Sequence, residues 1–464
     1  EAFFQATHGV PGPVFVEFPL DVLYPQERIR QDVMSKVENR TGFVATITRL
    51  YLKYYLQRLY GSGRAVHDES PSIPWKPQPQ VASHYAIQKA VQMLGQAKKP
   101  VLVVGSQAVM NRKDLLGDTY LFTLDTVVQS LRSLEIPTFL AGGARGCLGV
   151  GDDAKLHIRH KRSAALQQAD VVVLLGVPCD FRLNYGFVFT GHTKVIAVNI
   201  DKSELYRNKR PHLAVHAEVP DFIVRVAEQM AGGGDRKAWE EWRMHLQYEC
   251  EKRDEEIHVQ SQFKLPAETT LHDNKTVQVC NPVAVCLSLD KALRTPSVLV
   301  GDGGDFIGTA AYTIRPRNPQ CWLGPGPFGT LGVGAGFALG AKCVRPHSDV
   351  WLLWGDGSAA YSIMEYDTFV RHNINVIGVI GNDACWRQIH RDQVQSFDDA
   401  VACNLAFSDY HEVAKALGGK GYVVTKEEDM EETIEKAVVD VKSKPVLINV
   451  MIGKTSFRDG SISV

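Results

Sequence analysis

Near-continuous apolar runs, separated by helix-like segments, dominate two long stretches of the chain. Runs of this kind are typical of parallel strands that are covered by helices on both faces. The sequence therefore predicts an α/β protein with two doubly wound parallel sheets. In the first stretch the runs lie at 100–105, 136–140, 170–176 and 194–199. In the second they lie at 297–300, 350–354, 376–380 and 446–451, after an Asn281-Pro282 pair that is typical of a helix start.

The remaining segments suggest how the two sheets are connected. Gly12 to Pro19 has the pattern of a strand that finishes a preceding domain, and Arg236 to Glu256 that of a charged, solvated linker helix. The expected organisation is a domain remnant at 1–25, a linker at 26–83, a middle domain at 84–232, a linker helix at 233–265 and a second domain at 266–464.

The linker at 26–83 is too long for an ordinary loop, so part of it must be ordered. Val44 to Tyr60 has a helical pattern with a wide apolar face, rich in aromatic and basic residues. Two interpretations remain open: a linker helix that packs on a domain, or an interfacial helix in contact with a membrane surface. A proline-rich stretch at Ser70–Pro77 marks the boundary that follows.

Composition narrows the range of functions. The 51 Lys and Arg balance 52 Asp and Glu without long blocks of one sign, so nothing indicates a nucleic-acid partner. The nine cysteines contain no C-x-x-C pair, which indicates neither a disulfide framework nor a zinc site. No apolar run is long enough to cross a membrane, and the N-terminus resembles neither a signal peptide nor a start methionine. We expect small-molecule partners and a chain that starts inside a larger protein.

The candidate chemistry lies where two predicted strands end. Gly355-Asp356-Gly357-Ser358 follows one strand, and Asn382 follows the next, 26 positions after Asp356. Ligands of open α/β sheets bind at this edge. A carboxylate and an amide oxygen are hard donors that suit Mg²⁺, and the glycines allow backbone N–H groups to approach phosphates. Gly-Asp-Gly alone is a common turn. Together with an Asn 26 positions later, after the next strand, it indicates a site for a diphosphate and Mg²⁺.

This spacing resembles that of the thiamine-diphosphate-dependent enzymes. The segment from Gly324 to Gly336 is similar to that family's glycine-rich turn, with Leu331 where the family has an apolar support for the cofactor. The resemblance implies thiamine diphosphate and Mg²⁺ as cofactors. It implies cofactor contacts from Gly303, Gly304, Asp305, Gly329, Leu331, Gly355, Asp356, Gly357, Ser358 and Asn382, and magnesium ligands from Asp356, Asn382 and the carbonyl of Ala384.

Within the family, the chain resembles the acetolactate-synthase-like branch that includes 2-hydroxyacyl-CoA lyases. Cys385 to Ile389 replaces the Gly-Met-Val of true acetolactate synthases, so Trp386, Arg387 and Gln388 are predicted to form the substrate wall. The resemblance implies cleavage of a 2-hydroxyacyl-CoA to formyl-CoA and a fatty aldehyde one carbon shorter. A carboligase or 2-oxoacid decarboxylase, and a non-catalytic homologue, remain alternatives. No dinucleotide-binding glycine pattern follows the strand at 100–105, which disfavours a dehydrogenase.

Further expectations come from the resemblance alone. It places the activating glutamate upstream of Glu1, so this chain by itself is expected to be inactive, and Glu17 is expected to be a surface residue. It implies a homodimer or homotetramer at the endoplasmic reticulum membrane. Gly176-Val177-Pro178 stands where relatives carry a nucleotide-binding arginine, although Asp180 and Arg182 follow, so we assign no FAD.

Overall fold

The structure is a computed structural model that describes residues 2–7, 9–18, 23–60, 79–110, 122–269 and 274–459. The chain divides into two compact units. The first contains the described residues up to Pro79, and the second contains those from Gln80 onward. The predicted boundary stretch Ser70–Pro77 lies outside the described residues.

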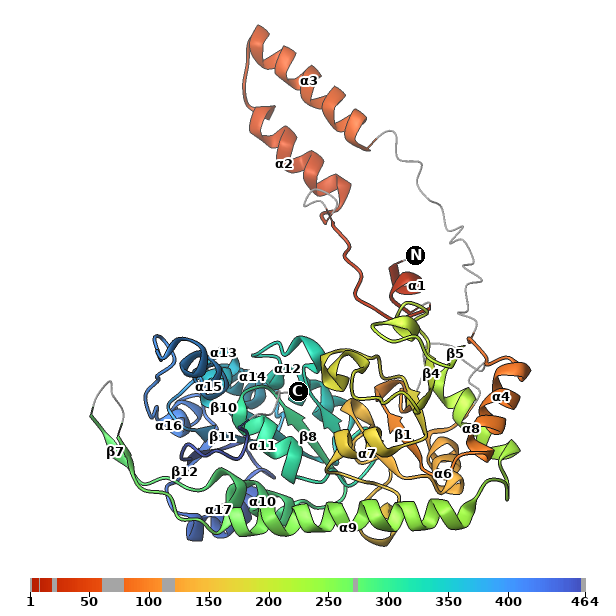
Figure 1. Ribbon diagram of the computed structural model, residues 1–464. Helices are drawn as coiled ribbons and strands as arrows, with labels where there is room; N and C mark the ends of the chain where they lie inside the picture. The colour runs from red at the N-terminus through yellow and green to blue at the C-terminus, as the bar shows by residue number, and fades with distance from the viewer. Residues whose placement is uncertain are drawn as a thin grey trace. The chain divides into compact units, whose positions relative to one another are not determined.

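The first unit consists of three helices. These are α1 (Ala2–Thr7), α2 (Gln26–Glu38) and α3 (Phe43–Tyr60), and α2 and α3 form a hairpin (Figure 1). The helix predicted over 44–60 is thus confirmed as α3. The strand predicted from Gly12 is wrong, because residues 11–18 have irregular backbone and pair with no strand in the described part of the chain. Glu17, in this segment, is exposed as expected.

A parallel sheet of five strands forms the middle domain in the second unit, in the order β2-β1-β3-β4-β5. Its strands are β1 (Pro100–Val104), β2 (Thr138–Leu140), β3 (Val171–Leu175), β4 (Lys194–Asn199) and β5 (Leu213–His216). Its helices are α4 (His84–Gly95), α6 (Leu124–Leu134), α7 (Arg162–Gln168) and α8 (Val219–Gln229). The central strands β1 and β3 are buried throughout, as their apolar sequences require.

The second parallel sheet has six strands in the order β12-β13-β11-β10-β8-β9. The strands are β8 (Ser297–Gly301), β9 (Trp322–Leu323), β10 (Asp349–Gly355), β11 (Ile377–Asn382), β12 (Lys420–Val424) and β13 (Val446–Met451). The helices are α10 (Pro282–Ala292), α11 (Asp305–Thr313), α12 (Gly334–Val344), α13 (Asp356–Ser362), α14 (Glu365–Arg371), α15 (Arg387–Phe397), α16 (Tyr410–Ala416) and α17 (Met430–Asp440). The α/β class with doubly wound parallel sheets is therefore confirmed.

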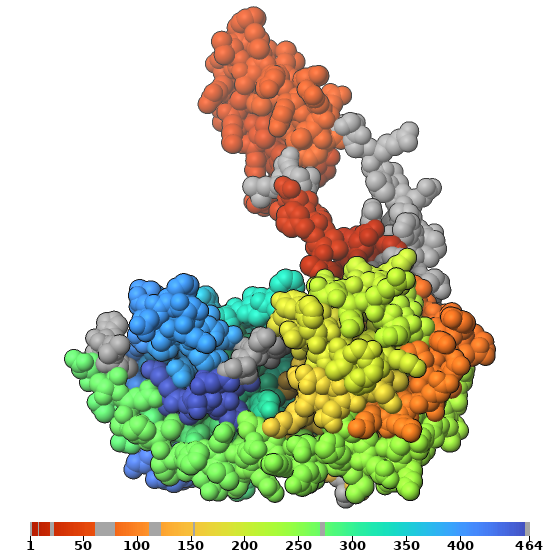
Figure 2. Space-filling model, viewed as in Figure 1, coloured from red at the N-terminus to blue at the C-terminus, as the bar shows by residue number. Residues whose placement is uncertain are grey.

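Helix α9 (Arg236–Ser261) runs below both sheets (Figure 1), and its outer side lies on the surface (Figure 2). It is more than the solvated linker that its charges predict. Trp239, Trp242, Leu246 and Cys250 recur at helical spacing and are buried in the core of the middle domain. After α9, a short antiparallel pair, β6 (Glu268–Thr269) and β7 (Thr276–Val277), precedes the second sheet.

The start of α10 shows how the sequence fixes one domain junction. The side chain of Asn281 accepts a hydrogen bond from the Val283 amide, which confirms the predicted helix cap. Its amide nitrogen also donates to the carbonyls of Gln260 and Phe263, at the end of α9. One side chain therefore caps a helix and ties the linker to the second domain.

Asn281→Ala should lower the free energy of unfolding by about 2 kcal/mol, because it removes a helix cap and two further, partly buried hydrogen bonds. Urea unfolding followed by tryptophan fluorescence measures the change. Ser83→Ala is the matched control, since Ser83 caps α4 through one bond to the Ala86 amide. A cost for Asn281→Ala no greater than that for Ser83→Ala would show that the tie to α9 contributes nothing.

Candidate active site

Glycines form a cradle at the carboxyl ends of β8 and β10. Gly303 and Gly304 follow β8, Gly355 ends β10, and all line one cavity of about 1620 Å³ together with Gly357. Gly304 has a φ of 106°, a conformation that L side chains rarely adopt. A Cβ on Gly303 would lie 2.1 Å from the Leu331 side chain, and one on Gly357 would lie 2.4 Å from the Trp386 ring. A side chain at Gly304 would strain the backbone, and one at Gly303 or Gly357 would displace Leu331 or Trp386.

Asp302 holds the glycine-rich segment over this cradle. Its buried carboxylate accepts hydrogen bonds from the amides of Gly332 and Gly334, at 2.9 and 2.8 Å, and from the indole of Trp354. Burial raises the pKa of Asp302. These bonds fix the backbone next to Leu331 and set its side chain against Gly303. Asp302 is thus a structural anchor of the site that the sequence analysis did not identify.

Two buried carboxylates face the same cavity. Asp356 is 3% exposed and accepts hydrogen bonds from the Gly357 amide at 2.7 Å and the Cys385 amide at 3.1 Å. Burial raises the pKa of Asp356, and these backbone hydrogen bonds oppose the rise. Asp383 is 7% exposed, and burial followed by the negative charge of Asp356 raises its pKa well above the ordinary value. A divalent cation would remove this mutual repulsion.

The structure places only one of the three predicted magnesium ligands, Asp356, in the lining of the cavity. Asn382 is the last residue of β11 and points into the fold, where its amide nitrogen donates to the carbonyl of Ser408 at 3.1 Å and to Asn449 at 3.4 Å. Its side-chain oxygen accepts from the Ala384 amide, and the Ala384 carbonyl accepts from the Leu405 amide at 2.7 Å. Neither Asn382 nor Ala384 lines the cavity, whereas Asp356, Asp383 and Cys385 do.

Three other predicted residues support the cradle in different ways. The Ser358 hydroxyl donates to the carbonyls of Gly303 and Gly355, so it braces the two strand ends against each other. Asp305 forms an ion pair with Arg391 at 3.0 Å. Gly329 lines the cavity with a φ of 59°. All three lie at the predicted site.

The predicted substrate wall faces the cavity as well. Trp386, Arg387 and Gln388, at the start of α15, line it beside the glycine cradle. The Trp386 ring lies over Gly357 and contacts the Tyr361 ring at a centroid distance of 6.3 Å. A bulky, partly buried indole therefore closes one side of the space above the two carboxylates.

The opposite wall is strongly basic and comes largely from the middle domain and α9. Its cationic side chains are those of Arg145, Lys155, Arg159, Lys161, Arg162, Arg182, Arg243 and Arg253, with Arg315 and Arg458 from the second domain. Burial and three neighbouring guanidinium groups lower the pKa of Arg145 to about 10. Burial, followed by the charges of Arg159, Arg145 and His160, lowers the pKa of His157 to about 3. Several of these cations form ion pairs, such as Arg159 with Asp254 and Arg182 with Asp180, whereas Arg145 and Arg162 donate to backbone carbonyls. The wall thus keeps an excess of positive charge, which suits a polyanion.

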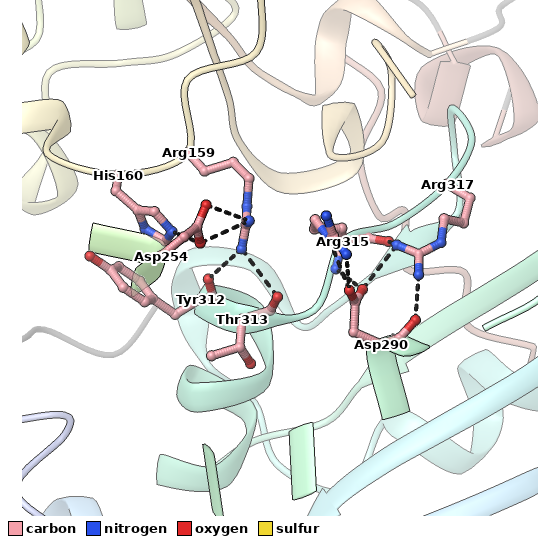
Figure 3. A network of polar contacts seen from close by, with 8 residues as sticks. All are labelled: Arg159, His160, Asp254, Asp290, Tyr312, Thr313, Arg315 and Arg317. Atoms are coloured by element: carbon pink, nitrogen blue, oxygen red, sulfur yellow. Dashed lines mark hydrogen bonds and ion pairs between the residues drawn. The ribbon is translucent and has the colours of Figure 1, made fainter. Parts of the chain in front are cut away.

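A polar network ties this wall to the cradle (Figure 3). Arg159 donates to the Asp254 carboxylate on α9 and to the carbonyls of Tyr312 and Thr313, at the end of α11. His160 contacts Asp254 at 3.0 Å. In the same view, Asp290 binds Arg315 and Arg317. Because α11 begins at the cradle, the network fixes the cavity between its two domains.

The site residues that were not predicted differ in how clearly the sequence indicates them. Asp383 is the first residue beyond β11, which is where ligands of a parallel sheet are expected, so its position was a usable signal. Asp302 follows β8 in the same way. The basic wall has no local signal, because its arginines come from segments spread between residues 145 and 458.

Comparison with known proteins agrees with this geometry. Residues 87–226 match the thiamine pyrophosphate enzyme central domain, and residues 302–450 match the C-terminal TPP-binding domain. The chain is 43% identical to 2-hydroxyacyl-CoA lyase 2 of Danio rerio over 99% of its own length and 70% of that protein. The chain belongs to the thiamine pyrophosphate enzyme family. Thiamine diphosphate is the cofactor of this family, and the chain is a thiamine-diphosphate-dependent enzyme by this membership.

Other thiamine pyrophosphate enzymes resemble the chain in sequence or in fold. The chain is 42% identical to human 2-hydroxyacyl-CoA lyase 2, over 100% of its length and 70% of that protein. It is 32% identical to an acetolactate synthase large subunit of Mycobacterium tuberculosis, over 79% of its length and 61% of that protein. A solved thiamine-diphosphate-dependent 4-hydroxybenzoylformate decarboxylase of Rhodococcus jostii shares the fold, with a TM-score of 0.61 and 19% identity over 81% of this chain and 65% of its own.

Asp383→Asn should stabilise the cation-free protein at neutral pH by on the order of 1 kcal/mol or more, because it removes one of two repelling buried carboxylates. The raised pKa values make the contribution of these two carboxyls to stability greatest in acid. For Asp356 this contribution begins to fall near pH 3.8, the ordinary pKa of its carboxyl, and is lost above about pH 7, its pKa in the fold. Thermal unfolding without divalent cations, from pH 5 to pH 8, measures the effect.

Asp392→Asn, at an exposed position on α15, is the control for loss of one negative charge. The interpretation fails if Asp383→Asn lowers stability at pH 8, or if it leaves the slope between pH 5 and pH 7 as steep as in the wild type.

Proposed function

We propose that the intact protein is a carbon–carbon lyase that cleaves a 2-hydroxyacyl-CoA to formyl-CoA and a fatty aldehyde one carbon shorter. The observation that carries the proposal is the basic wall opposite the glycine cradle. Coenzyme A is a polyanion with a long flexible arm, so a substrate could place its phosphates on the arginines and its thioester above the cofactor cradle. The relatives named 2-hydroxyacyl-CoA lyase 2, about 40% identical over the full chain, support the same substrate class.

The cradle fits thiamine diphosphate with a divalent cation. The cation would be Mg²⁺, held by the carboxylates of Asp356 and Asp383, which are buried and hard oxygen donors. The glycine backbone at 303–304 and 355–357 would receive the diphosphate, and Leu331 would support the cofactor from the side. When bound, thiamine diphosphate supplies a nucleophilic carbon and a sink for the electron pair of the broken bond.

The protein's own residues would bind and orient the substrate. Trp386 and Gln388 would exclude water from the thioester carbonyl, and the basic wall would hold the coenzyme A phosphates. In the overall reaction the bond between C1 and C2 breaks and the C2 hydroxyl loses its proton as the aldehyde forms. The one-carbon fragment gains a proton and leaves as formyl-CoA. No electrons are gained or lost overall, so no redox cofactor is needed.

Two other functions are distinguishable by their products. The acetolactate synthase relative favours a carboligase or 2-oxoacid decarboxylase as the second candidate, with the same cofactor residues. A non-catalytic homologue would keep the fold without turnover. We place the activating glutamate in the part of the 2-hydroxyacyl-CoA lyase 2 relatives that has no counterpart here, since the chain spans 70% of their length. This chain alone would then be inactive, so activity is tested on full-length protein.

Location and assembly are proposals as well. The resemblance favours a homodimer or homotetramer at the endoplasmic reticulum membrane. None of the helices that the structure describes is both long enough and apolar enough to span a bilayer.

Titration calorimetry of thiamine diphosphate with Mg²⁺ into full-length protein tests the cofactor site. Asp356→Ala and Asp383→Ala should each weaken binding at least about tenfold, because each removes a side chain that would bind the cation. Asp392→Asn should bind like the wild type. Unchanged binding by Asp383→Ala would return the ligand role to Asn382.

Arg162→Gln tests the substrate class. Its guanidinium lines the cavity and donates to the Arg182 carbonyl, away from the cradle. Loss of one charged contact to a phosphate should raise the KM for a long-chain 2-hydroxyacyl-CoA roughly tenfold with little change in kcat. Formyl-CoA and aldehyde are assayed together.

Arg207→Gln, at an exposed arginine of the middle domain paired with Glu204, is the control and should keep the wild-type KM. A 2-oxoacid turned over in place of the thioester would contradict the lyase proposal. An unchanged KM for Arg162→Gln would contradict the assignment of the basic wall.

A further inference from the structure

One face of α3 carries a continuous stripe of exposed apolar and aromatic side chains. They recur at intervals of one, three and four residues, which places them on one side of the helix. The stripe consists of Phe43, Val44, Ile47, Leu50, Tyr51, Tyr54 and Tyr55, and their exposed fractions range from 47% to 79%. Isolated exposed apolar residues are ordinary, but seven exposed apolar or aromatic side chains on one helix face are typical of a binding surface.

The stripe is not needed to hold the hairpin together. The opposite face of α3 packs on α2 through Ala45 and Leu56, which are buried. The guanidinium of Arg49 donates to the carbonyls of Val37 and Glu38 at the end of α2, both at 3.1 Å. The hairpin is therefore held together by its inner face, and the exposed apolar stripe on its outer face can bind another surface.

The charge of the hairpin indicates the nature of that surface. Helix α3 contains Arg49, Lys53 and Arg58 and no acidic residue. Residues 26–60 hold seven Lys or Arg and three Asp or Glu. Three of the seven stripe residues are tyrosines, whose rings are apolar and whose hydroxyl groups are polar. Arg49 is bonded to α2, but Lys53, which stands next to Tyr54 in the sequence, suits the interface of a bilayer with anionic headgroups.

We propose that α3 lies flat on the surface of a bilayer that contains anionic phospholipids, with its stripe in the headgroup region. A second copy of α3 is a poorer occupant, because two helices without acidic residues would bring like charges together. The proposal concerns surface docking only and does not depend on the lyase reaction or on a spanning segment elsewhere.

Flotation of the whole chain with phosphatidylcholine vesicles, with and without phosphatidylserine, tests the proposal. The wild type should float with the anionic vesicles, and Leu50→Asp/Tyr54→Asp should reduce the bound fraction at least about tenfold. Tyr248→Asp/Val439→Asp is the matched control, since these residues are 62% and 64% exposed and lie on α9 and α17. Lys53→Glu should reduce binding to the anionic vesicles, and added salt should do the same.

Circular dichroism shows whether the double variant keeps its helices, and Tyr54→Phe, which preserves the ring, should float like the wild type. The proposal is overturned if the wild type does not bind anionic vesicles, or if Leu50→Asp/Tyr54→Asp binds as well as its control. It is also overturned if the double variant converts an oligomer to monomers while vesicle binding is unchanged, since the stripe would then be a contact between copies.

Discussion

The central constraint on this protein is the repulsion between two carboxylates that face one cavity. Asp356 and Asp383 are almost fully buried at the ends of neighbouring strands, and burial raises the pKa of each. Such a pair is unfavourable unless protons or a cation neutralise it. The glycine cradle beside it leaves room for an anionic group to share that cation. The fold thus accepts a local electrostatic cost that ligand binding would remove.

The rest of the site can be understood from this arrangement. Asp302 fixes the glycine-rich segment, and Ser358 braces the two strand ends, so that the cradle keeps its shape next to the repelling pair. The cavity then runs from a negative end in the second domain to a positive wall in the middle domain. Arg159 links the two ends through Asp254 and the end of α11. This polarity suits a cation-bound cofactor at one end and a polyanionic substrate tail at the other.

The sequence predicts the fold well because the buried strands are continuous apolar runs. It does not reveal β5, β9 and β12, which are short or only partly buried. The difference between the predicted and the observed position of the Asn382 side chain has a related cause. In a strand buried on both faces no alternation shows which side chains point inward, so the last strand residue and the first loop residue are hard to separate. The basic wall exists only after distant segments meet, so no local pattern predicts it.

A structure of the full-length protein with thiamine diphosphate and Mn²⁺ in place of Mg²⁺ tests the central claim most directly, since Mn²⁺ is located by its anomalous scattering. The account predicts one Mn²⁺ ion bound by the carboxylates of both Asp356 and Asp383, with Asn382 still bonded to the Ser408 carbonyl. A cation bound by the Asn382 side chain, with Asp383 turned away from it, would contradict the account.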